Sequence, residues 1–292
     1  MSYSDFSGLS ITKVDKTLIA VIDSPPFNML TRELLADLDR FTEQASMDSD
    51  VLVIVLKSAD PDFFITHAEF ANLYELQPHK VPDSVEEVDL NDVQKLCERL
   101  RTMTKVTIAQ VEGRVSGGGA AMVMACDMRY GARGKAVFNT MSVPVGCVPG
   151  GGASQYMPRL IGYARAAELI LAGLDLDADT ADRWGYINRA IEAEQIDQFV
   201  GNVTKRISSA PPEAIRLTKE VLTMSAGSIE DGLRQENFRF RQLLNSDASR
   251  ANVRTFLELG GQTREGELQL ESLLGRVIFS SEQAQLSRDP TK

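Results

Sequence analysis

Two runs of three glycines are the features of this sequence best suited to chemistry. They are Gly117–Gly119 and Gly150–Gly152, the second directly after Pro149. Neither run has the Gly-Lys-Ser/Thr ending of a Walker loop or the glycine spacing of a dinucleotide-binding turn. A triple glycine that opens a helix instead presents backbone N–H groups that no side chain shields, where a developing negative charge can be held. The alternative interpretation is close backbone packing.

Histidine and serine are the other candidates for chemistry. The chain has 2 histidines, and His67 could shuttle protons because the unperturbed pKa of histidine is near physiological pH. The alternative is that His67 points away from any ligand. A serine hydrolase would need Ser116, Ser142 or Ser154 beside a histidine, but both histidines precede these serines in the chain. This order disfavours a ClpP-type hydrolase without excluding it, because a triad is recognised by geometry.

The glycine runs lie within an alternation of strand and helix patterns. Apolar, β-branched runs at 17–23, 51–56 and 106–111 predict strands, and apolar residues at helical spacing from Leu34 to Phe41 predict a helix between the first two. Such alternation indicates an α/β fold.

Later segments complete this prediction. Residues 113–119 are predicted as a loop, followed by a small-residue helix from about Ala120. From Ser154 onward the helical period dominates, so the C-terminal third is predicted to be mostly helical. Residues 78–92 are predicted as a solvated insertion, and the chain is expected to end in a polar tail.

Composition excludes several classes of protein. The 292 residues are 43% hydrophobic and 25% charged, which is ordinary globular composition, and the net charge of −10 argues against binding nucleic acid or an anionic membrane. The 3 cysteines have neither disulfide-framework nor zinc-site spacing, so no metal is expected. We expect neither a leader sequence nor a membrane-spanning segment, and we expect a cytoplasmic protein.

Four segments in order resemble the crotonase (enoyl-CoA hydratase/isomerase) superfamily. Residues 108–127 (IAQVEGRVSGGGAAMVMACD) are similar to its strand, Gly-Gly-Gly and helix motif, and 24–30 (SPPFNML) to its Pro-x-x-Asn-Ala-Leu segment. Residues 62–69 (DFFITHAE) resemble its Phe-x-x-Gly-Ala-Asp loop, and 146–152 (GCVPGGG) its Gly-x-x-Pro-Gly-x-Gly-Gly turn. The resemblance covers residues from about 8 to about 260.

The resemblance implies a fold and an assembly. We expect an α/β fold with a crotonase-like ββα spiral core at residues 1–200, a helical C-terminal oligomerisation region at 201–280, and a polar tail at 281–292. Members of the family form trimers, often paired into hexamers. The implied ligand is an acyl-CoA or acyl-carrier thioester, with coenzyme A as part of the substrate and no separate cofactor.

The resemblance also assigns site residues. The oxyanion-hole donors fall on the backbone N–H groups of Ala68 and Gly118, which would polarise a thioester carbonyl. His67 and Ser142 are additional catalytic candidates. Glu69 either caps the following helix or acts as a base. The residues expected to contact substrate are Asn28, Met29, Phe64, Thr66, Tyr74, Gly117, Asn139 and Thr140, and those that could meet CoA phosphates are Arg216, Lys219 and Arg239.

The chain departs from the family at the residues that handle water. Hydratases of this family use two glutamates, and their positions align with Ala121 and Ser142, which cannot do the acid/base work of a carboxylate. We therefore expect altered chemistry: decarboxylation, isomerisation, or C–C bond formation or cleavage through a stabilised enolate. The alternatives are a catalytically inactive thioester-binding paralogue and, less favoured, an ordinary enoyl-CoA hydratase.

Overall fold

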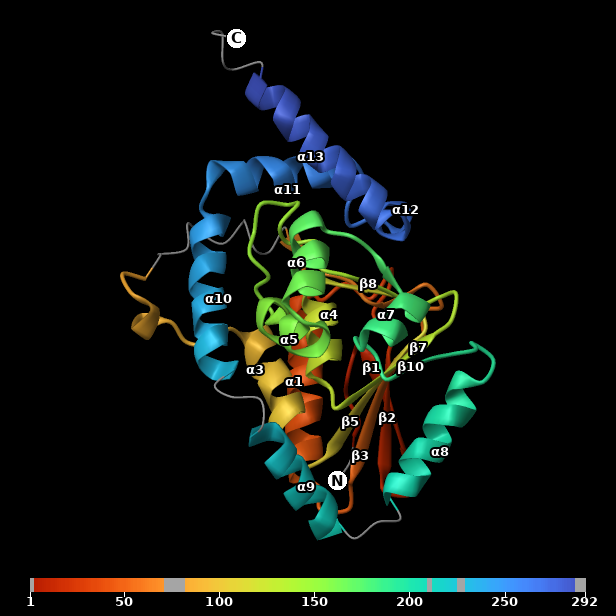
Figure 1. Cartoon of the computed structure of the whole chain (residues 1–292). Coiled ribbons are helices and arrows are strands. Elements are labelled where there is room, and N and C mark those ends of the chain that lie inside the picture. The colour runs from red at the N-terminus through yellow and green to blue at the C-terminus, as the bar shows by residue number, and fades with distance from the viewer. Residues whose placement is uncertain (1–2, 71–81, 209–211, 225–228, 287–292) are drawn as a thin grey trace.

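The computed structural model describes residues 3–70, 82–208, 212–224 and 229–286 (Figure 1). A six-stranded sheet forms its centre, in the order β1-β2-β3-β5-β7-β10. Only β1 and β2 are antiparallel, and the other neighbours are parallel. The strands are β1 (Leu9–Val14), β2 (Thr17–Ile22), β3 (Val53–Ser58), β5 (Val106–Val111), β7 (Met128–Ala132) and β10 (Arg189–Ile191).

A smaller sheet alternates with the first along the chain. Its order is β4-β6-β8-β9, with β4, β6 and β8 parallel. Each of β3, β5 and β7 in the large sheet is followed by a strand of the small sheet and then by helix. The fold is therefore the predicted α/β arrangement of repeated ββα units. The small-sheet strands are β4 (Phe63–Ile65), β6 (Arg114–Ser116), β8 (Val137–Asn139) and β9 (Leu176–Asp177).

Helices cover both faces of the large sheet, as Figure 1 shows. Helix α8 (Ile196–Ser208) packs on one face through a cluster that includes Ile196 and Val200. The main hydrophobic core lies on the other face, where α1 buries Leu34, Leu38 and Phe41. The helices of this layer and its neighbours are α1 (Arg32–Met47), α3 (Asp92–Thr102), α4 (Gly117–Ala125), α5 (Ala153–Ile161), α6 (Tyr163–Ala172) and α7 (Ala178–Trp184), with a short 3-10 turn at Val85–Glu87.

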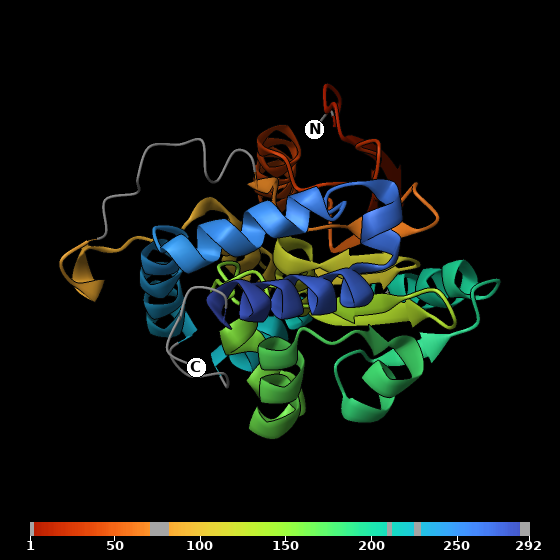
Figure 2. The ribbon, with the colours of Figure 1, turned by 90° about the horizontal axis from the view of Figure 1, so that it is seen from above.

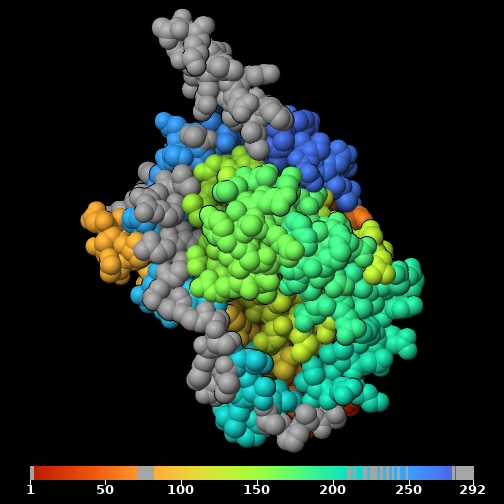
Figure 3. Space-filling view, viewed as in Figure 1, coloured from red at the N-terminus to blue at the C-terminus, as the bar shows by residue number. Residues whose placement is uncertain are grey.

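The C-terminal region is helical, as predicted. Helices α11 and α13 lie side by side across one end of the core (Figures 1 and 2), joined by a cluster that includes Phe256 and Leu273. In the space-filling view the blue C-terminal residues form this end of the molecule (Figure 3). The helices are α9 (Pro212–Met224), α10 (Ile229–Leu244), α11 (Asp247–Glu258), α12 (Arg264–Leu268) and α13 (Leu270–Leu286). Among the described residues no helix combines the length and apolarity needed to span a bilayer.

Two local predictions need correction. The triple glycine forms the first turn of α4 and not a loop before it, and this turn packs tightly against β4: a Cβ on Gly119 would lie 2.6 Å from the carbonyl oxygen of Ile65. Helix α3 begins at Asp92, inside the predicted insertion, with a capping box formed by Asn91 and Gln94. Helix α8 spans residue 200 and α13 runs to Leu286, and the division into domains remains a prediction.

Candidate active site

A cavity of about 890 Å³ lies between the first turn of α1, the segment after β4, the first turn of α4, and α10. Six of the predicted site residues line it, and these are His67, Ala68, Gly117, Gly118, Thr140 and Ser142. Apolar side chains such as Phe70, Val145, Phe240 and Leu244 form much of the remaining wall. The cavity therefore combines apolar surface with the two backbone segments that were predicted to bind an oxyanion.

The segment that carries Ala68 is held against the start of α1. Thr66 donates its N–H to the carbonyl oxygen of Asn28 at 3.0 Å, and Leu30 donates to that of His67 at 3.2 Å. Ala68 itself forms an isolated parallel bridge with Leu30. The N–H of Ala68 has no backbone acceptor in the described part of the chain, so it remains available for a ligand in the cavity.

The second predicted donor, Gly118, lies in the first turn of α4. The first N–H groups of a helix have no partner within the helix, and the positive end of the helix dipole lies there. Gly117 has a φ of +52°, and a Cβ on it would lie 2.8 Å from the Cβ of His67. A Cβ on Gly118 would lie 2.9 Å from Cδ2 of Leu30. A Cβ on Gly117 would therefore meet the rigid Cβ and Cα of His67, whereas one on Gly118 would meet only the flexible end of Leu30.

His67 is buried and engaged at both ring nitrogens. Nε2 lies 2.6 Å from Oε1 of Glu267, a fully buried residue of α12, and Nδ1 lies 3.0 Å from the carbonyl oxygen of Ala68. Burial opposes protonation of the ring, but the Glu267 carboxylate and the hydrogen bonds outweigh it and raise the pKa of His67. Burial would also raise the pKa of Glu267, yet the charge of His67 lowers it. We conclude that the two side chains form a buried ion pair.

This arrangement does not support a serine hydrolase in the described part of the chain. Both nitrogens of His67 are taken by Glu267 and Ala68, so the ring is not hydrogen-bonded to Ser116, Ser142 or Ser154. The hydroxyl of Ser116 is buried without a partner among the described residues. The second histidine, His79, lies outside the described residues.

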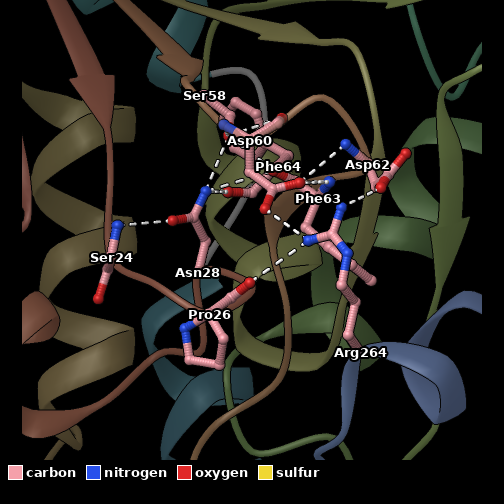
Figure 4. A network of polar contacts seen from close by, with 9 residues as sticks. All are labelled: Ser24, Pro26, Asn28, Ser58, Asp60, Asp62, Phe63, Phe64 and Arg264. Carbon is pink, nitrogen blue, oxygen red and sulfur yellow. Dashed lines mark hydrogen bonds and ion pairs between the residues drawn. The ribbon is translucent and has the colours of Figure 1, made fainter.

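The structure does not bring five of the expected substrate contacts to the cavity wall, and these are Asn28, Met29, Phe64, Thr66 and Asn139. Asn28 stabilises a turn instead: it accepts the N–H of Ser24 at 2.7 Å and donates to Ser58 at 2.8 Å (Figure 4). Asn139, at the end of β8, donates to the carbonyl oxygen of Gly173 and to the carboxylate of Asp175, both between α6 and β9. Phe64 and Thr66 are fully buried, and Met29 is half-buried outside the cavity. Tyr74 lies outside the described residues.

The cations expected to meet CoA phosphates also have other roles. Lys219 is buried, with Nζ 2.7 Å from the carboxylate of Asp127 and 2.5 Å from the carbonyl oxygen of Lys105. Arg216 pairs with Glu213 on the surface of α9. The side chain of Arg239 lies outside what the structure describes. Sequence reasoning missed the cations that do line the cavity, Arg32, Lys95, Arg99 and Arg241, because their spacing gives no signal.

Comparison with known proteins decides the family. The sequence model described as "Enoyl-CoA hydratase/isomerase" matches residues 16–264. The chain belongs to the enoyl-CoA hydratase/isomerase family. A candidate enoyl-CoA hydratase from Streptomyces avermitilis has a crystal structure that superposes with a TM-score of 0.84 at 31% identity, over 94% of this chain and 99% of that one.

Two curated relatives of this enoyl-CoA hydratase/isomerase family member are named as hydratases. The short-chain-enoyl-CoA hydratase of Clostridium acetobutylicum is 26% identical over 257 residues, which cover 87% of this chain and 96% of the relative. A protein of Bacillus subtilis named as a probable enoyl-CoA hydratase is 27% identical, over 85% of this chain and 95% of its own length. The matches extend over nearly the whole length of these relatives.

The structure shows what occupies the two positions that the family resemblance assigns to glutamates. Ala121 is fully buried on α4, and its Cβ faces Gly151, on which a Cβ would lie 3.0 Å away. Ser142 is half-buried and lines the cavity. The acidic residues of the wall are Asp39, Glu69 and Asp92, and Asp39 and Asp92 pair with Arg99 and Lys95. The third, Glu69, directly follows Ala68.

Proposed function

We propose that this chain binds an acyl-CoA thioester with its carbonyl oxygen between the N–H groups of Ala68 and Gly118. Preorganised donors of this kind stabilise the negative charge that develops on the oxygen when an enolate forms. The observation that carries the proposal is the convergence of these two backbone segments in one cavity. The apolar wall suits an acyl chain.

The cations of the cavity wall suit the other end of such a ligand. Arg32 and Arg241 have no ion-pair partner among the described residues, so their charge is available for the phosphates of coenzyme A. They take the role that the sequence had suggested for Arg216 and Lys219, which have partners elsewhere.

For the reaction, we propose enolate chemistry that needs no glutamate pair, with decarboxylation as the leading case. A malonyl-type acyl-CoA would lose carbon dioxide, and the electrons of the broken C–C bond would pass into the thioester enolate. The oxyanion hole holds that enolate until its α-carbon takes up a proton. Ala121 and Ser142 supply no carboxylate, and cleavage of the C–C bond in this reaction requires none.

The second candidate is hydration or isomerisation of an enoyl-CoA, which the names of the relatives favour. Both reactions require a general base. Glu69 is the carboxylate of the wall next to an oxyanion donor, so this candidate predicts that Glu69→Gln abolishes turnover. Decarboxylation predicts that the same variant keeps most of its activity.

A panel assay separates these candidates. Purified protein is incubated with malonyl-type, 3-enoyl, crotonyl, 3-hydroxy and 3-oxo acyl-CoAs, and products are measured by mass spectrometry alongside ligand binding. Turnover of malonyl-type thioesters without crotonyl hydration supports the proposal. Hydration of crotonyl-CoA that is lost in Glu69→Gln supports the second candidate. Tight binding without turnover of any compound would show a non-catalytic thioester-binding protein.

The oxyanion hole is tested by a pair of substitutions at one residue. Gly118→Pro removes the N–H, while Gly118→Ala keeps it and introduces the same Cβ contact with Leu30. We expect the proline variant to be at least about 100-fold slower than the alanine variant. Equal rates for the two variants would contradict the assignment of this N–H. The trimeric or hexameric assembly and the cytoplasmic location remain predictions.

A further inference from the structure

Glu267 reaches the active site from a distant part of the chain. It belongs to α12, and 200 residues separate it from His67, to which it is hydrogen-bonded at 2.6 Å. The family match ends at residue 264, so Glu267 lies beyond the segment that the family model covers. His67 is 2% exposed and Glu267 is 0% exposed, which makes this a contact inside the protein.

The hydrogen-bond partners identify how the pair is protonated. The carbonyl oxygen of Ala68 can only accept, so Nδ1 of His67 is the donor in their 3.0 Å contact. Oε1 of Glu267 already accepts the backbone N–H of Gln262 at 2.9 Å, as a carboxylate oxygen does. The raised pKa of His67 and the lowered pKa of Glu267 favour the ionised carboxylate, to which Nε2 of His67 then donates, so that the ring carries both protons.

The imidazole is fixed in place from the other sides as well. The ring of Phe70 stacks on it at 5.1 Å between centroids, and Phe256 of α11 meets it edge-on at 5.6 Å. Gly117 packs against its Cβ. A ring packed in this way has one orientation, in which Nδ1 faces the carbonyl oxygen of Ala68.

These contacts fix both peptide planes that flank Ala68. The plane that contains the N–H of Ala68 also contains the carbonyl of His67, which accepts from Leu30. The following plane contains the carbonyl of Ala68, which accepts from the His67 ring and from Nε2 of Gln262 at 3.3 Å. An oxyanion-hole donor is effective only when it is oriented before the reaction, because no energy is then spent on reorganisation.

We propose that Glu267 is a positioning residue for the oxyanion hole, acting through His67 and together with Gln262 to hold Ala68 in its donor orientation. The inference rests on the proposed function, since it concerns the same N–H group. Its consequence is that Gln262 and Glu267 of the C-terminal region serve the oxyanion hole and do not only cover the core.

Arg264 provides a matched control on the same helix. Its guanidinium pairs with Asp60 at 3.0 Å and with Asp62, in the loop between β3 and β4 (Figure 4). Arg264→Gln therefore weakens the docking of α12 without touching the segment that carries Ala68. Glu267→Gln keeps an oxygen for His67 and Gln262 but removes the charge that stabilises the imidazolium.

The test uses butyryl-CoA labelled with ¹³C at the carbonyl, a saturated thioester that reports polarisation without turnover. We expect the bound carbonyl stretch of the wild-type protein to shift to lower frequency by isotope-edited infrared spectroscopy. Glu267→Gln should lose at least about half of that shift, with the dissociation constant changed less than about threefold, while Arg264→Gln keeps the full shift. With a reactive substrate, kcat of Glu267→Gln should fall about 10- to 100-fold at nearly constant KM.

A second variant keeps the inference testable if Glu267→Gln does not fold. Gln262 has a φ of +62°, which asparagine also tolerates, and the shorter side chain of Gln262→Asn cannot reach Ala68. We expect a smaller but measurable loss of the infrared shift. A full shift in both variants would overturn the inference alone. No shift in the wild-type protein with butyryl-CoA bound would overturn the proposed function, and the inference with it.

Discussion

Replacing Gly117 with alanine should both destabilise the protein and disturb the oxyanion hole. Gly117 has a φ of +52°, and forcing an L-residue into this left-handed region costs about 1 kcal/mol. The new Cβ would also lie 2.8 Å from the Cβ of His67 and 3.1 Å from its Cα. Neither atom is the end of a flexible chain, and overpacking of this kind costs about 1–3 kcal/mol. We therefore expect Gly117→Ala to lose roughly 2–4 kcal/mol of unfolding free energy.

Alanine variants at two other glycines separate the cost of the left-handed backbone from the cost of overpacking. Gly134 has a φ of +73° with nothing within 4 Å of an added Cβ, so Gly134→Ala should lose only about 1 kcal/mol. Gly201, within α8, also has open space, and Gly201→Ala should be neutral or stabilising by up to about 1 kcal/mol. Each of the three variants differs from the wild-type protein by one added methyl group, so their stabilities can be compared directly.

Thermal and urea unfolding of the three variants measures stability, and the infrared shift of bound butyryl-CoA reports the oxyanion hole. Gly117→Ala should lower Tm by roughly 5–10 °C and reduce the shift, because the methyl group pushes His67 and with it Ala68. Gly134→Ala should leave the shift unchanged. If Gly117→Ala were no less stable than Gly134→Ala, the close contact between α4 and His67 would be refuted.

Three further predictions follow from buried groups. The pKa of His67 is raised, so its pairing stabilises the protein fully below the ordinary value of 6.5, and this stabilisation is lost as pH rises through the pKa of the folded state. The pKa of Glu267 is lowered, with Arg114 as a further contributing charge, so its stabilisation is lost as pH falls below the ordinary value of 4.5. Urea unfolding between pH 6 and 9 should therefore show a smaller alkaline loss of stability in Glu267→Gln than in the wild-type protein. Lys219→Met should cost about 2–4 kcal/mol, since it leaves a carboxylate without its cation, whereas the surface variant Arg216→Met should change stability by less than about 0.5 kcal/mol; equal losses would contradict the buried pairing. Burial raises the pKa of Cys126 to about 12, so peptide mapping after thiol labelling at pH 8 should find it unlabelled in the native protein and labelled in urea.

Local patterns in the sequence were sufficient for the central elements. The strand predicted at 106–111 is β5, which is buried along its whole length, and the spacing of Leu34, Leu38 and Phe41 predicts the inner face of α1. These predictions held because strand and helix periodicity depend on which side chains face the core, and that is encoded in neighbouring residues. The start of α4 was misplaced, because glycine is a weak helix former and only packing against β4 makes its first turn helical.

The site was only partly predictable for a related reason. The sequence by itself indicated the family, which the family model confirms, and it predicted Ala68 and Gly118 as oxyanion donors; the structure brings both residues to one cavity, and their role remains a prediction. The sequence did not show that Asn28 and Asn139 stabilise turns and strands. The position of an asparagine in the sequence is the same whether its side-chain amide binds a ligand or a backbone group.

Only the tertiary structure decided the role of His67. From the sequence its ring could shuttle protons or point away from the ligand, and neither interpretation included Glu267. The ion pair joins residues 200 positions apart, and the energy of such a contact depends on burial and distance, for which a linear sequence has no local pattern. Folding of the C-terminal helices over the core brings the carboxylate of Glu267 to the imidazole of His67, whose other nitrogen contacts the carbonyl oxygen of Ala68.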